Sequence, residues 1–439
     1  MRIGILGGGL SGLSLGSLIK HSYKILEKNS ECGGLCRTLH DQGFTFDYGG
    51  CHIVYSKDDQ ALEFILGLLK QNKRKNKRKN KILYKGHYVK YPFENGLRDL
   101  PLEDNFECIN EFIKNLIKKE KNNIGSPNNF HEWCTNTFGD GIASKYLVPY
   151  NEKIWKYDLT DMSTFWIGER LPNPPIEDII KSSLGIETEG YTHQLYYYYP
   201  ITGGIQAVID SLTEDLKPNI LTGFDIKNIS KKGKEWQVSD NKTTERFDQI
   251  VSTIPIFDLI ESIEDVPVEV KEALKRLKYN RLLTVLLGVS KPRINDYSAI
   301  YIPDKNVLSH RLGMLSNFSS QCAPKGYSSI LAEITCPMQD DDIWQKTDNM
   351  IIDRVMNDLI QLGIVNGKKE ICYTNIKRSE YAYVIYDMNY KQNMKIIKDY
   401  INKLGITLLG RFSEFEYLNM DACIRRAMNL AERLNVNEQ

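Results

Sequence analysis

The sequence predicts an α/β protein that contains a parallel sheet, a helical insertion and a second, antiparallel sheet. Three observations carry this prediction: a strand, turn, helix and strand pattern over residues 1–27, helical apolar spacing through the region 100–190, and strand-like apolar runs within 281–375. At 439 residues the chain is too long for one hydrophobic core, so we expect two or three packed units.

The N-terminal pattern indicates a βαβ unit. Ile3 to Leu6 is a short apolar run, a glycine-rich stretch follows it, and Leu13 to Ile19 has helical apolar spacing. Tyr23 to Glu27 predicts a second short strand. Because a single helix separates the two strands, we expect them to lie parallel in one doubly wound sheet.

The later elements follow from apolar periodicity. Helices are predicted at Asp58 to Leu69, Leu102 to Lys121, Phe130 to Leu147 and Ile205 to Leu216. Strands that begin near Ile220, Trp236 and Gln249 are expected to return the chain to the first sheet. The second sheet is expected to contain Leu282 to Val289, Ala299 to Ile302 and Ile330 to Thr335, with a helix from Asp348 to Leu362. A last strand, Ile406 to Leu409, precedes a closing helix, Ala422 to Leu434.

The charge balance argues against a general binder of polyanions. There are 57 Lys and Arg against 56 Asp and Glu, which gives a formal net charge of +1, so nucleic acid is not an expected partner. One segment departs from this balance, because Lys70 to Lys81 holds eight basic residues and no acid. We expect this run to be a solvated loop, with a docking patch as the alternative.

The cysteine and histidine content predicts neither a metal site nor a disulfide framework. Nine Cys are scattered without a CxxC pair, and there are seven His. No segment has 18 continuous apolar residues, so we expect no membrane span. These features predict a cytoplasmic protein. Cys51 is expected to be a small packed side chain rather than a reactive thiol.

A dinucleotide-binding fingerprint lies between the first strand and helix. Gly7, Gly9 and Gly12 have the GxGxxG spacing, which allows backbone N–H groups at Leu10 and Ser11 to approach a pyrophosphate. Glu27, next to Lys28, ends the second strand, where a carboxylate can accept hydrogen bonds from ribose hydroxyls. The alternative is a glycine turn that only packs a helix on a sheet.

A second glycine turn extends the fingerprint. Gly33 and Gly34 are followed by Arg37, and a third small-residue segment leads through Gly50 to His52. With these segments the chain resembles the flavoprotein superfamily of amine oxidases, protoporphyrinogen oxidases and UDP-galactopyranose mutases. The resemblance implies FAD as the cofactor and a discontinuous, Rossmann-like FAD-binding domain at 1–95, 200–280 and 376–439. It also implies a helical insertion at 96–199 and an antiparallel-sheet substrate domain at 281–375.

Several segments look more like the mutases within that superfamily. These are the glycine–histidine segment before Tyr55, Tyr150 to Trp155 with the later Arg170, Glu380 to Tyr383, and Gly410 to Asp421. The resemblance implies a flavin-dependent isomerase of polysaccharide biosynthesis that interconverts pyranose and furanose forms of a UDP-sugar. In such enzymes N5 of the reduced flavin attacks the sugar, so NAD(P)H or another reductant is expected. Tyr55 and Ser56 depart from the mutase pattern.

Site residues follow from this resemblance, each with a plainer alternative. Arg411, Met420 and Asp421 are expected beside the flavin, although an N-cap role alone explains Asp421. The expected catalytic residues are His52, Arg170 and Arg411, and the expected substrate-binding residues are Trp155, Arg170, Tyr381 and Tyr417. The alternatives are a core histidine, a surface ion pair for either arginine and a core tryptophan.

Two other functions compete with the mutase. One is an FAD-dependent oxidoreductase of the amine oxidase or protoporphyrinogen oxidase type, which predicts a more apolar cleft without phosphate-binding residues. The other is a non-catalytic flavin-fold protein that acts through Lys70 to Lys81. Tyr196 to Tyr199 are expected to alternate between the two faces of a strand and to line the cleft with one face.

Overall fold

The computed structural model describes residues 1–121, 125–168, 173–189, 195–339 and 342–436. Its first layer is a five-stranded parallel sheet with the order β19-β13-β1-β2-β9. The strands are β1 (Arg2–Leu6), β2 (Ser22–Glu27), β9 (Ile220–Thr222), β13 (Gln249–Ser252) and β19 (Thr407–Leu408). The predicted βαβ unit is confirmed, and strands from three distant parts of the chain complete its sheet.

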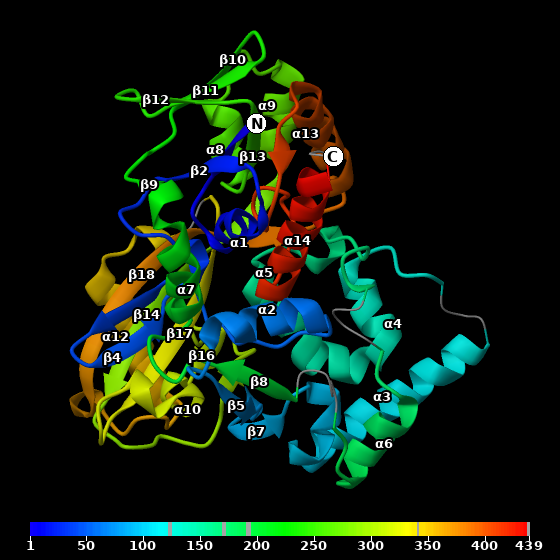
Figure 1. Ribbon diagram of the computed structural model, residues 1–439. Helices are drawn as coiled ribbons and strands as arrows, with labels where there is room; N and C mark the ends of the chain where they lie inside the picture. The colour runs from blue at the N-terminus through cyan, green and yellow to red at the C-terminus, as the bar shows by residue number, and fades with distance from the viewer. Residues whose placement is uncertain (122–124, 169–172, 190–194, 340–341, 437–439) are drawn as a thin grey trace.

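Helices cover both faces of the parallel sheet (Figure 1). Ile3, Ile5 and Ile25 pack with the helices of one face: α1 (Leu10–Leu18), α2 (Asp59–Leu69), α7 (Gln206–Leu216) and α14 (Met420–Val436). Leu6 and Leu26 pack with those of the other: α8 (Ile256–Ser262), α9 (Val268–Arg276) and α13 (Tyr390–Leu404). Since alternate residues of one strand face opposite sides, the short apolar strands supply both cores.

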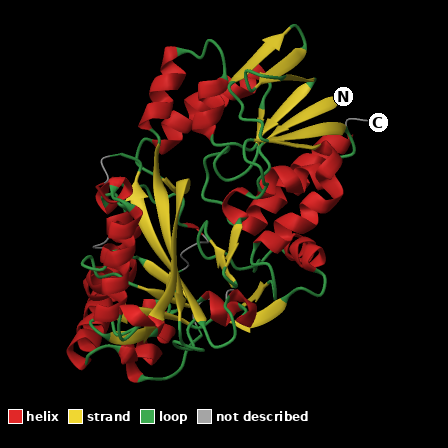
Figure 2. Ribbon diagram, turned by 90° about the vertical axis from the view of Figure 1, so that its left-hand side faces the viewer, coloured by secondary structure: helices red, strands yellow, loops and turns green. Residues whose placement is uncertain are grey.

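The second large sheet has seven strands in the order β18-β14-β17-β16-β15-β6-β7. They are β6 (Asn80–Tyr84), β7 (His87–Lys90), β14 (Lys278–Val289), β15 (Ala299–Tyr301), β16 (Arg311–Gly313), β17 (Ser328–Pro337) and β18 (Ile371–Ile385). All neighbours are antiparallel except β6 and β15. Figure 2 shows the long strands of this sheet separate from the short parallel strands at the upper right. Two short helices, α10 (Leu315–Phe318) and α11 (Asp342–Gln345), and the longer α12 (Asp348–Gln361) accompany the sheet.

The helical insertion has its own core and lies at the lower right of Figure 1. It consists of α3 (Leu102–Glu120), α4 (Phe130–Ile142), α5 (Val148–Trp155) and α6 (Ile176–Leu184). A π-helical turn, Ala143–Leu147, joins α4 to α5. The predicted helix over Phe130 to Leu147 is therefore one part of a longer helical stretch.

Smaller sheets complete the molecule. β10 (Asn228–Lys232), β11 (Glu235–Ser239) and β12 (Thr244–Phe247) form an antiparallel sheet of three strands. β3 (Thr38–Asp41) pairs with β4 (Phe44–Asp47), and β5 (Arg74–Lys77) pairs with β8 (Tyr196–Tyr199). No helix among the described residues is long and apolar enough to cross a membrane.

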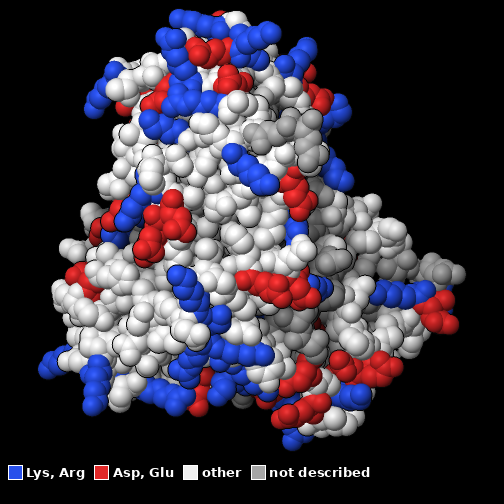
Figure 3. All heavy atoms as spheres, viewed as in Figure 1, with Lys and Arg blue, Asp and Glu red and all other residues white. Residues whose placement is uncertain are grey.

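The prediction of a solvated loop at Lys70 to Lys81 is wrong, because this segment contains β5 and the start of β6. β5 pairs with the tyrosine strand β8, and the Lys75 ammonium lies 5.0 Å from the ring centre of Tyr196 and 5.9 Å from that of Tyr198. Lys and Arg gather over this lower part of the face in Figure 3. The tyrosines alternate as predicted: Tyr197 and Tyr199 are buried, and Tyr196 is exposed.

The sheets cross two of the predicted domain boundaries. β6 and β7 precede residue 95, and β18 spans residue 376, yet all three strands belong to the seven-stranded sheet. The reason is that β18 pairs with β14 along most of its length, so residues on both sides of the predicted boundary at 375/376 belong to one strand. The three-part division itself remains a proposal.

An ion pair holds α2 against α14 and provides a pH-dependent test. Asp58 caps α2 by accepting from Ala61 N at 3.1 Å, and Arg425 of α14 donates to both of its carboxylate oxygens at 2.5 Å. The hydrogen bond from Arg425 lowers the pKa of Asp58 from 3.8 to about 2. The pair therefore stabilises the fold above about pH 3.8, and this contribution falls as the pH drops toward 2.

Asp58→Asn should lower the free energy of unfolding by about 1 kcal/mol or less near pH 6, because Asn keeps the cap but loses the ion pair. The difference from the parent protein should shrink between pH 4 and pH 2 as the parent loses its own pair. Urea unfolding at several pH values measures both quantities. A difference that stays constant over this range would contradict the assignment.

Candidate functional site

A cavity of ≈ 1550 Å³ lies where the parallel sheet, the antiparallel sheet and the helical insertion meet. Its lining draws on the N-terminal glycine turns, on α5, on β18 and on the start of α14. Pockets for single drug-sized ligands have volumes of about 300–1,000 Å³, so this cavity has room for a large cofactor together with a substrate.

The fingerprint glycines form the turn at one end of this cavity. Gly7 has a positive φ of 105°, and Gly8 N donates to Oε2 of the buried Glu27 at 2.8 Å. The other oxygen of Glu27 accepts from the backbone and side-chain nitrogens of Asn29. A buried carboxylate is thus held at the end of β2, next to the N-terminus of α1.

Two glycines of the fingerprint do different work. A Cβ on Gly12 would lie 2.1 Å from Gly7 O, so Gly12 is needed for the close packing of helix on strand, and it does not line the cavity. A Cβ on Gly9 would meet no protein atom within 4 Å, and Gly9 has an ordinary extended backbone with φ −78°. Gly9 therefore keeps space open for something other than the chain itself.

The second glycine turn lies beside the first. Gly33 N donates to Gly8 O at 2.9 Å, and both Gly33 and Gly34 have positive φ. Arg37 pairs with the exposed Glu31 at 3.0 Å, and its guanidinium lies 5.7 Å from the ring centre of Tyr48. Lys28 is more exposed and pairs with Asp258 at 3.7 Å.

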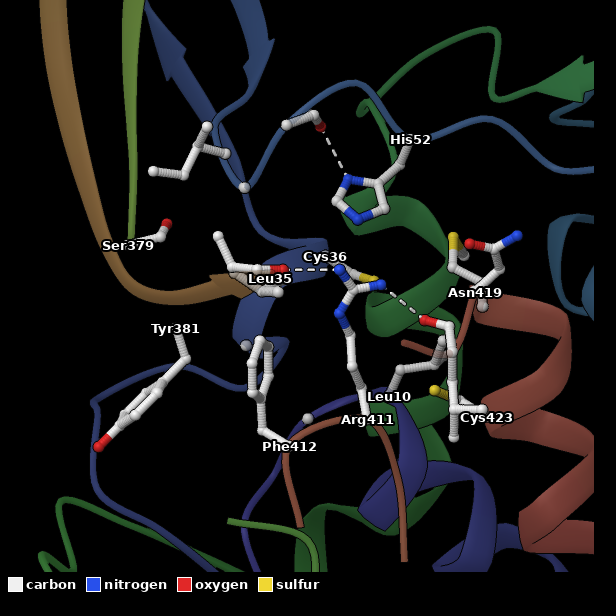
Figure 4. A pocket seen from close by; sticks show the side chains of 18 of the residues that line it. Leu10, Leu35, Cys36, His52, Ser379, Tyr381, Arg411, Phe412, Asn419 and Cys423 are labelled. Atoms are coloured by element: carbon white, nitrogen blue, oxygen red, sulfur yellow. Dashed lines mark hydrogen bonds between the residues drawn. The ribbon is translucent and has the colours of Figure 1, made fainter. Parts of the chain in front are cut away.

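His52 faces the middle of the cavity in Figure 4. Its Nδ1 lies 2.8 Å from Gly50 O, and because a carbonyl oxygen only accepts, Nδ1 carries the proton. Burial lowers the pKa of His52, so the ring is neutral and Nε2 is an acceptor. Gly50 has a positive φ of 106°, which turns the chain at this point.

Arg411 joins β18 to the segment before α14. Its Nη2 donates to Ala382 O at 2.6 Å and its Nη1 to Leu418 O at 2.8 Å, as Figure 4 shows. The guanidinium also lies 4.0 Å from the ring centre of Tyr417. Its Nε is buried and donates to none of the described residues.

Met420 and Asp421 form the first turn of α14 at the cavity wall, and Asp421 accepts a hydrogen bond from the hydroxyl of Ser56 at 2.6 Å.

The described cofactor-side residues predicted from the sequence, other than Gly12, all line one cavity. They are Gly7, Gly9, Leu10, Ser11, Glu27, Lys28, Gly33, Gly34, Arg37, Gly50, His52, Arg411, Met420 and Asp421. Cys51 lines it too, but burial raises its thiol pKa well above the ordinary value, which agrees with a packed side chain.

The predicted substrate residues do not all point into the same part of the cavity. Trp155 is only 5% exposed and packs edge-on against Trp166 and Tyr417, with its Nε1 donating to Asn151 at 3.0 Å. Tyr381 points away from Arg411 in Figure 4, and its hydroxyl donates to Asp258 at 2.7 Å. Arg170 lies outside the described residues.

Tyr383, rather than Tyr381, packs against the predicted substrate residues Trp155 and Tyr417. It is two residues further along β18 and also lines the cavity. Its ring stacks on Tyr417 at 5.9 Å and meets Trp155 edge-on at 6.1 Å.

An ion pair that sequence reasoning missed lies in the antiparallel wall of the cavity. Arg311 of β16 donates from Nε and Nη2 to the fully buried Glu333 of β17 at 2.9 and 2.6 Å. Burial opposes ionisation of Glu333, but the Arg311 charge outweighs it, and the pKa of Glu333 lies below its ordinary value. Arg311 lines the cavity, and no described residue accepts a hydrogen bond from its Nη1. The sequence holds one sign of this ion pair, a lone Glu within the apolar run Ile330 to Thr335, because a carboxylate buried in a strand needs a cation beside it.

A buried lysine, Lys153, binds the loop that precedes Arg311. Lys153 of α5 donates to Ile302 O, Asp304 O and Ser309 O at 2.7–2.9 Å. Burial lowers its pKa to about 7. These bonds hold α5, which carries Trp155, against the loop that leads into Arg311.

Several known proteins have a similar fold. A structure of reduced UDP-galactopyranose mutase superposes with a TM-score of 0.90 at 22% identity, covering 100% of this chain and 96% of that one. A putative protoporphyrinogen oxidase from Exiguobacterium sp. 255-15 gives 0.78 at 17% identity, covering 100% and 99%. An uncharacterized protein of Methanocaldococcus jannaschii, MJ1488, is 23% identical over 348 residues, which are 76% of this chain and 77% of that protein.

The resemblance to the mutases and oxidases is thereby confirmed for the fold, an FAD-binding type of α/β architecture. The sequence also matches the model of one family, described as flavin-containing amine oxidoreductase, over residues 10–389. This match spans most of the chain, and it includes Gly12, Glu27, Arg311 and Glu333. The chain therefore belongs to the family of flavin-containing amine oxidoreductases.

Proposed function

We propose that the protein binds FAD and, with the flavin reduced, interconverts the pyranose and furanose forms of a UDP-sugar. The observation that carries this proposal is that several arginine and tyrosine side chains line the cavity beside the cofactor segments. Guanidinium and phenol groups suit a diphosphate, whereas oxidation of an amine or a porphyrinogen has no need of them.

The residues present fit FAD. The N-terminus of α1 and the open space at Gly9 suit the pyrophosphate, and the carboxylate of Glu27 suits the ribose hydroxyls. The glycine–histidine segment at Gly50 and the start of α14 would hold the flavin ring, and the N-terminal dipole of α14 would stabilise negative charge on it. Bound and reduced, the flavin supplies a nucleophilic nitrogen for covalent catalysis at the sugar, with NAD(P)H or another reductant as the electron source.

The chain's own residues would bind and orient the nucleotide sugar. Arg311 is fixed by Glu333 and has Nη1 left to donate to a phosphate oxygen. Tyr301 and Tyr383 line the same cavity. The mutase-like segment adds Arg170 as a second proposed cation. Neutral His52 can accept a hydrogen bond through Nε2 but carries no charge to repel the arginines.

The first functional prediction concerns the cofactor. Gly9→Val should fold normally, because the backbone of Gly9 is extended and a Cβ there meets no protein atom within 4 Å, yet it should purify without bound flavin because the side chain fills the pyrophosphate's space. Gly67→Val on α2 is the matched control, since its Cβ also meets no atom within 4 Å and it does not line the cavity. Flavin absorbance per protein measures occupancy, and full occupancy in Gly9→Val would refute the placement.

The second functional prediction concerns the substrate. Arg311→Lys keeps a cation beside Glu333 but loses the planar fork, so it should retain flavin and lower kcat/KM for a UDP-sugar by about 100-fold. The exposed Arg293, paired with Asp296, gives the control variant Arg293→Lys, which should leave turnover unchanged. Unaltered kcat/KM in Arg311→Lys would remove Arg311 from the substrate site.

Arg170→Ala tests the other proposed cation. It should weaken or stop turnover while flavin stays bound, because the interaction lost is with the substrate's diphosphate. The assay separates UDP-pyranose from UDP-furanose by chromatography after incubation with dithionite-reduced enzyme, and it includes several UDP-hexoses and pentoses. If none is bound or converted while an amine or a porphyrinogen reduces the oxidised flavin, the oxidoreductase function replaces the mutase.

A further inference from the structure

The basic run, Lys70 to Lys81, presents different residues to the cavity and to the solvent. Successive residues of an extended chain point to opposite sides. Arg78 and Asn80 point to one side and line the cavity. The positions that alternate with them do not line the cavity and are exposed lysines: Lys75, Lys77 and Lys79. The run therefore places a row of lysines on the side away from the cavity.

The tyrosine strand β8 adds aromatic rings to this row. Tyr196 lies opposite Lys77 in the β5–β8 ladder, and Tyr198 lies opposite Lys75. The exposed fraction of Tyr196 is 48%. Figure 3 shows Lys and Arg gathered over this part of the surface, in the lower middle of the view. Together these side chains form the outer face of the ladder, which consists of Lys75, Lys77, Lys79, Tyr196 and Tyr198.

Few acids neutralise the outer face. Lys77 pairs with Glu189 at 3.4 Å, but the two side chains are 50% and 44% exposed, and an ion pair in water at this exposure is weak. No acid among the described residues pairs with Lys75 or Lys79. The formal net charge of the whole chain is only +1, so the excess of cations is a local property of this surface. A surface of this kind is complementary to an anionic partner.

We propose that the outer face docks on an anionic lipid bilayer. Each Lys or Arg close to such a bilayer strengthens binding by about fivefold. The phenol rings of Tyr196 and Tyr198 suit the level of the lipid headgroups, because each ring has an apolar body and a polar tip.

An exposed apolar side chain lies next to the basic run as well. Ile201 follows β8 and is 39% exposed. The next residue, Thr202, donates from its backbone N to Oδ1 of Asn72 at 2.9 Å, which fixes this segment beside the run. Cations, phenols and an apolar side chain are the combination that peripheral proteins place in the headgroup region.

Nucleic acid and a second copy of the chain fit the outer face less well. Proteins that bind single strands stack bases on open aromatic rings. Here the Lys75 ammonium lies over the rings, 5.0 Å from the centre of Tyr196 and 5.9 Å from that of Tyr198, so it occupies a face that a base would need. A two-fold axis through the outer face would bring lysines of both copies together, and like charges repel.

Docking through the outer face would hold the cavity close to the membrane. Arg78 and Tyr197 line the cavity, and the residues on either side of each in the chain belong to the outer face. This placement does not depend on the reaction that the cavity performs. It can therefore be tested separately from the proposed function.

Vesicle sedimentation with the full-length chain as purified tests the proposal. The parent protein should pellet with vesicles of phosphatidylcholine mixed with phosphatidylglycerol and stay in solution with phosphatidylcholine alone, and added salt should weaken binding. The triple variant Lys75→Gln, Lys77→Gln, Lys79→Gln should bind about 100-fold more weakly, because it loses three cations from the outer face. Lys79→Gln alone should bind about fivefold more weakly. The Lys79 side chain has no hydrogen bond or ion pair to a described residue, so this variant should leave the fold undisturbed.

The matched control removes the same charge from the other end of the molecule. Lys232→Gln, Lys234→Gln, Lys242→Gln changes three exposed lysines of the small sheet β10–β12, at the top of Figure 1, and should bind like the parent. Equal thermal unfolding of all variants checks that each is folded.

Four results would each overturn the proposal. They are a parent protein that does not pellet with the phosphatidylglycerol vesicles, an outer-face triple variant that binds like the parent, a control that loses as much binding as that variant, and tighter binding of a single-stranded oligonucleotide, measured by fluorescence anisotropy, than of the vesicles.

Discussion

The carboxylate of Glu333, which has no contact with water, sets the geometry of the candidate site. It accepts two hydrogen bonds from Arg311 and one from Cys51 N at 3.1 Å, so a single group joins β16, β17 and the glycine–histidine segment. Leaving one member of such a buried pair without its partner costs about 3–5 kcal/mol. The chain must therefore keep Arg311 and the segment around His52 in fixed relation, which aligns the two walls of the cavity.

The topology explains why a site of this kind needs a discontinuous chain. The parallel sheet supplies the glycine turns at the carboxyl ends of β1 and β2, where nucleotides bind in open α/β sheets. The antiparallel sheet and α5 supply arginine and tyrosine from the middle of the chain. Arg411 connects the two sheets, because its hydrogen bonds to two carbonyl oxygens join β18 of the second sheet to the segment that precedes α14.

The helical insertion presents different chemistry on its two sides. α5 faces inward and carries Trp155 to the cavity, with Lys153 holding it against the loop before Arg311. α3 faces outward and leaves several apolar side chains exposed. The residues that the insertion places at the cavity are therefore different from those it leaves exposed on its outer side.

The sequence by itself determined the features that depend on local spacing. The βαβ unit, the turn at Gly9, the buried acid Glu27 and the helices of the insertion all follow from periods and intervals within a few tens of residues. The resemblance of several separate motifs to known flavoproteins predicted the fold, which the comparisons confirmed.

Only the tertiary structure decided which distant side chains meet. The basic run forms a strand because Tyr196 to Tyr199, more than a hundred residues later, pair with it, and nothing in its own composition favours a strand. Tyr381 turns to Asp258 and Tyr383 reaches the aromatic cluster, a choice set by packing against α8 and Trp155. Arg311 and Glu333 carry no motif. Their roles arise because neighbouring strands place a cation beside a carboxylate that burial would otherwise leave without a partner.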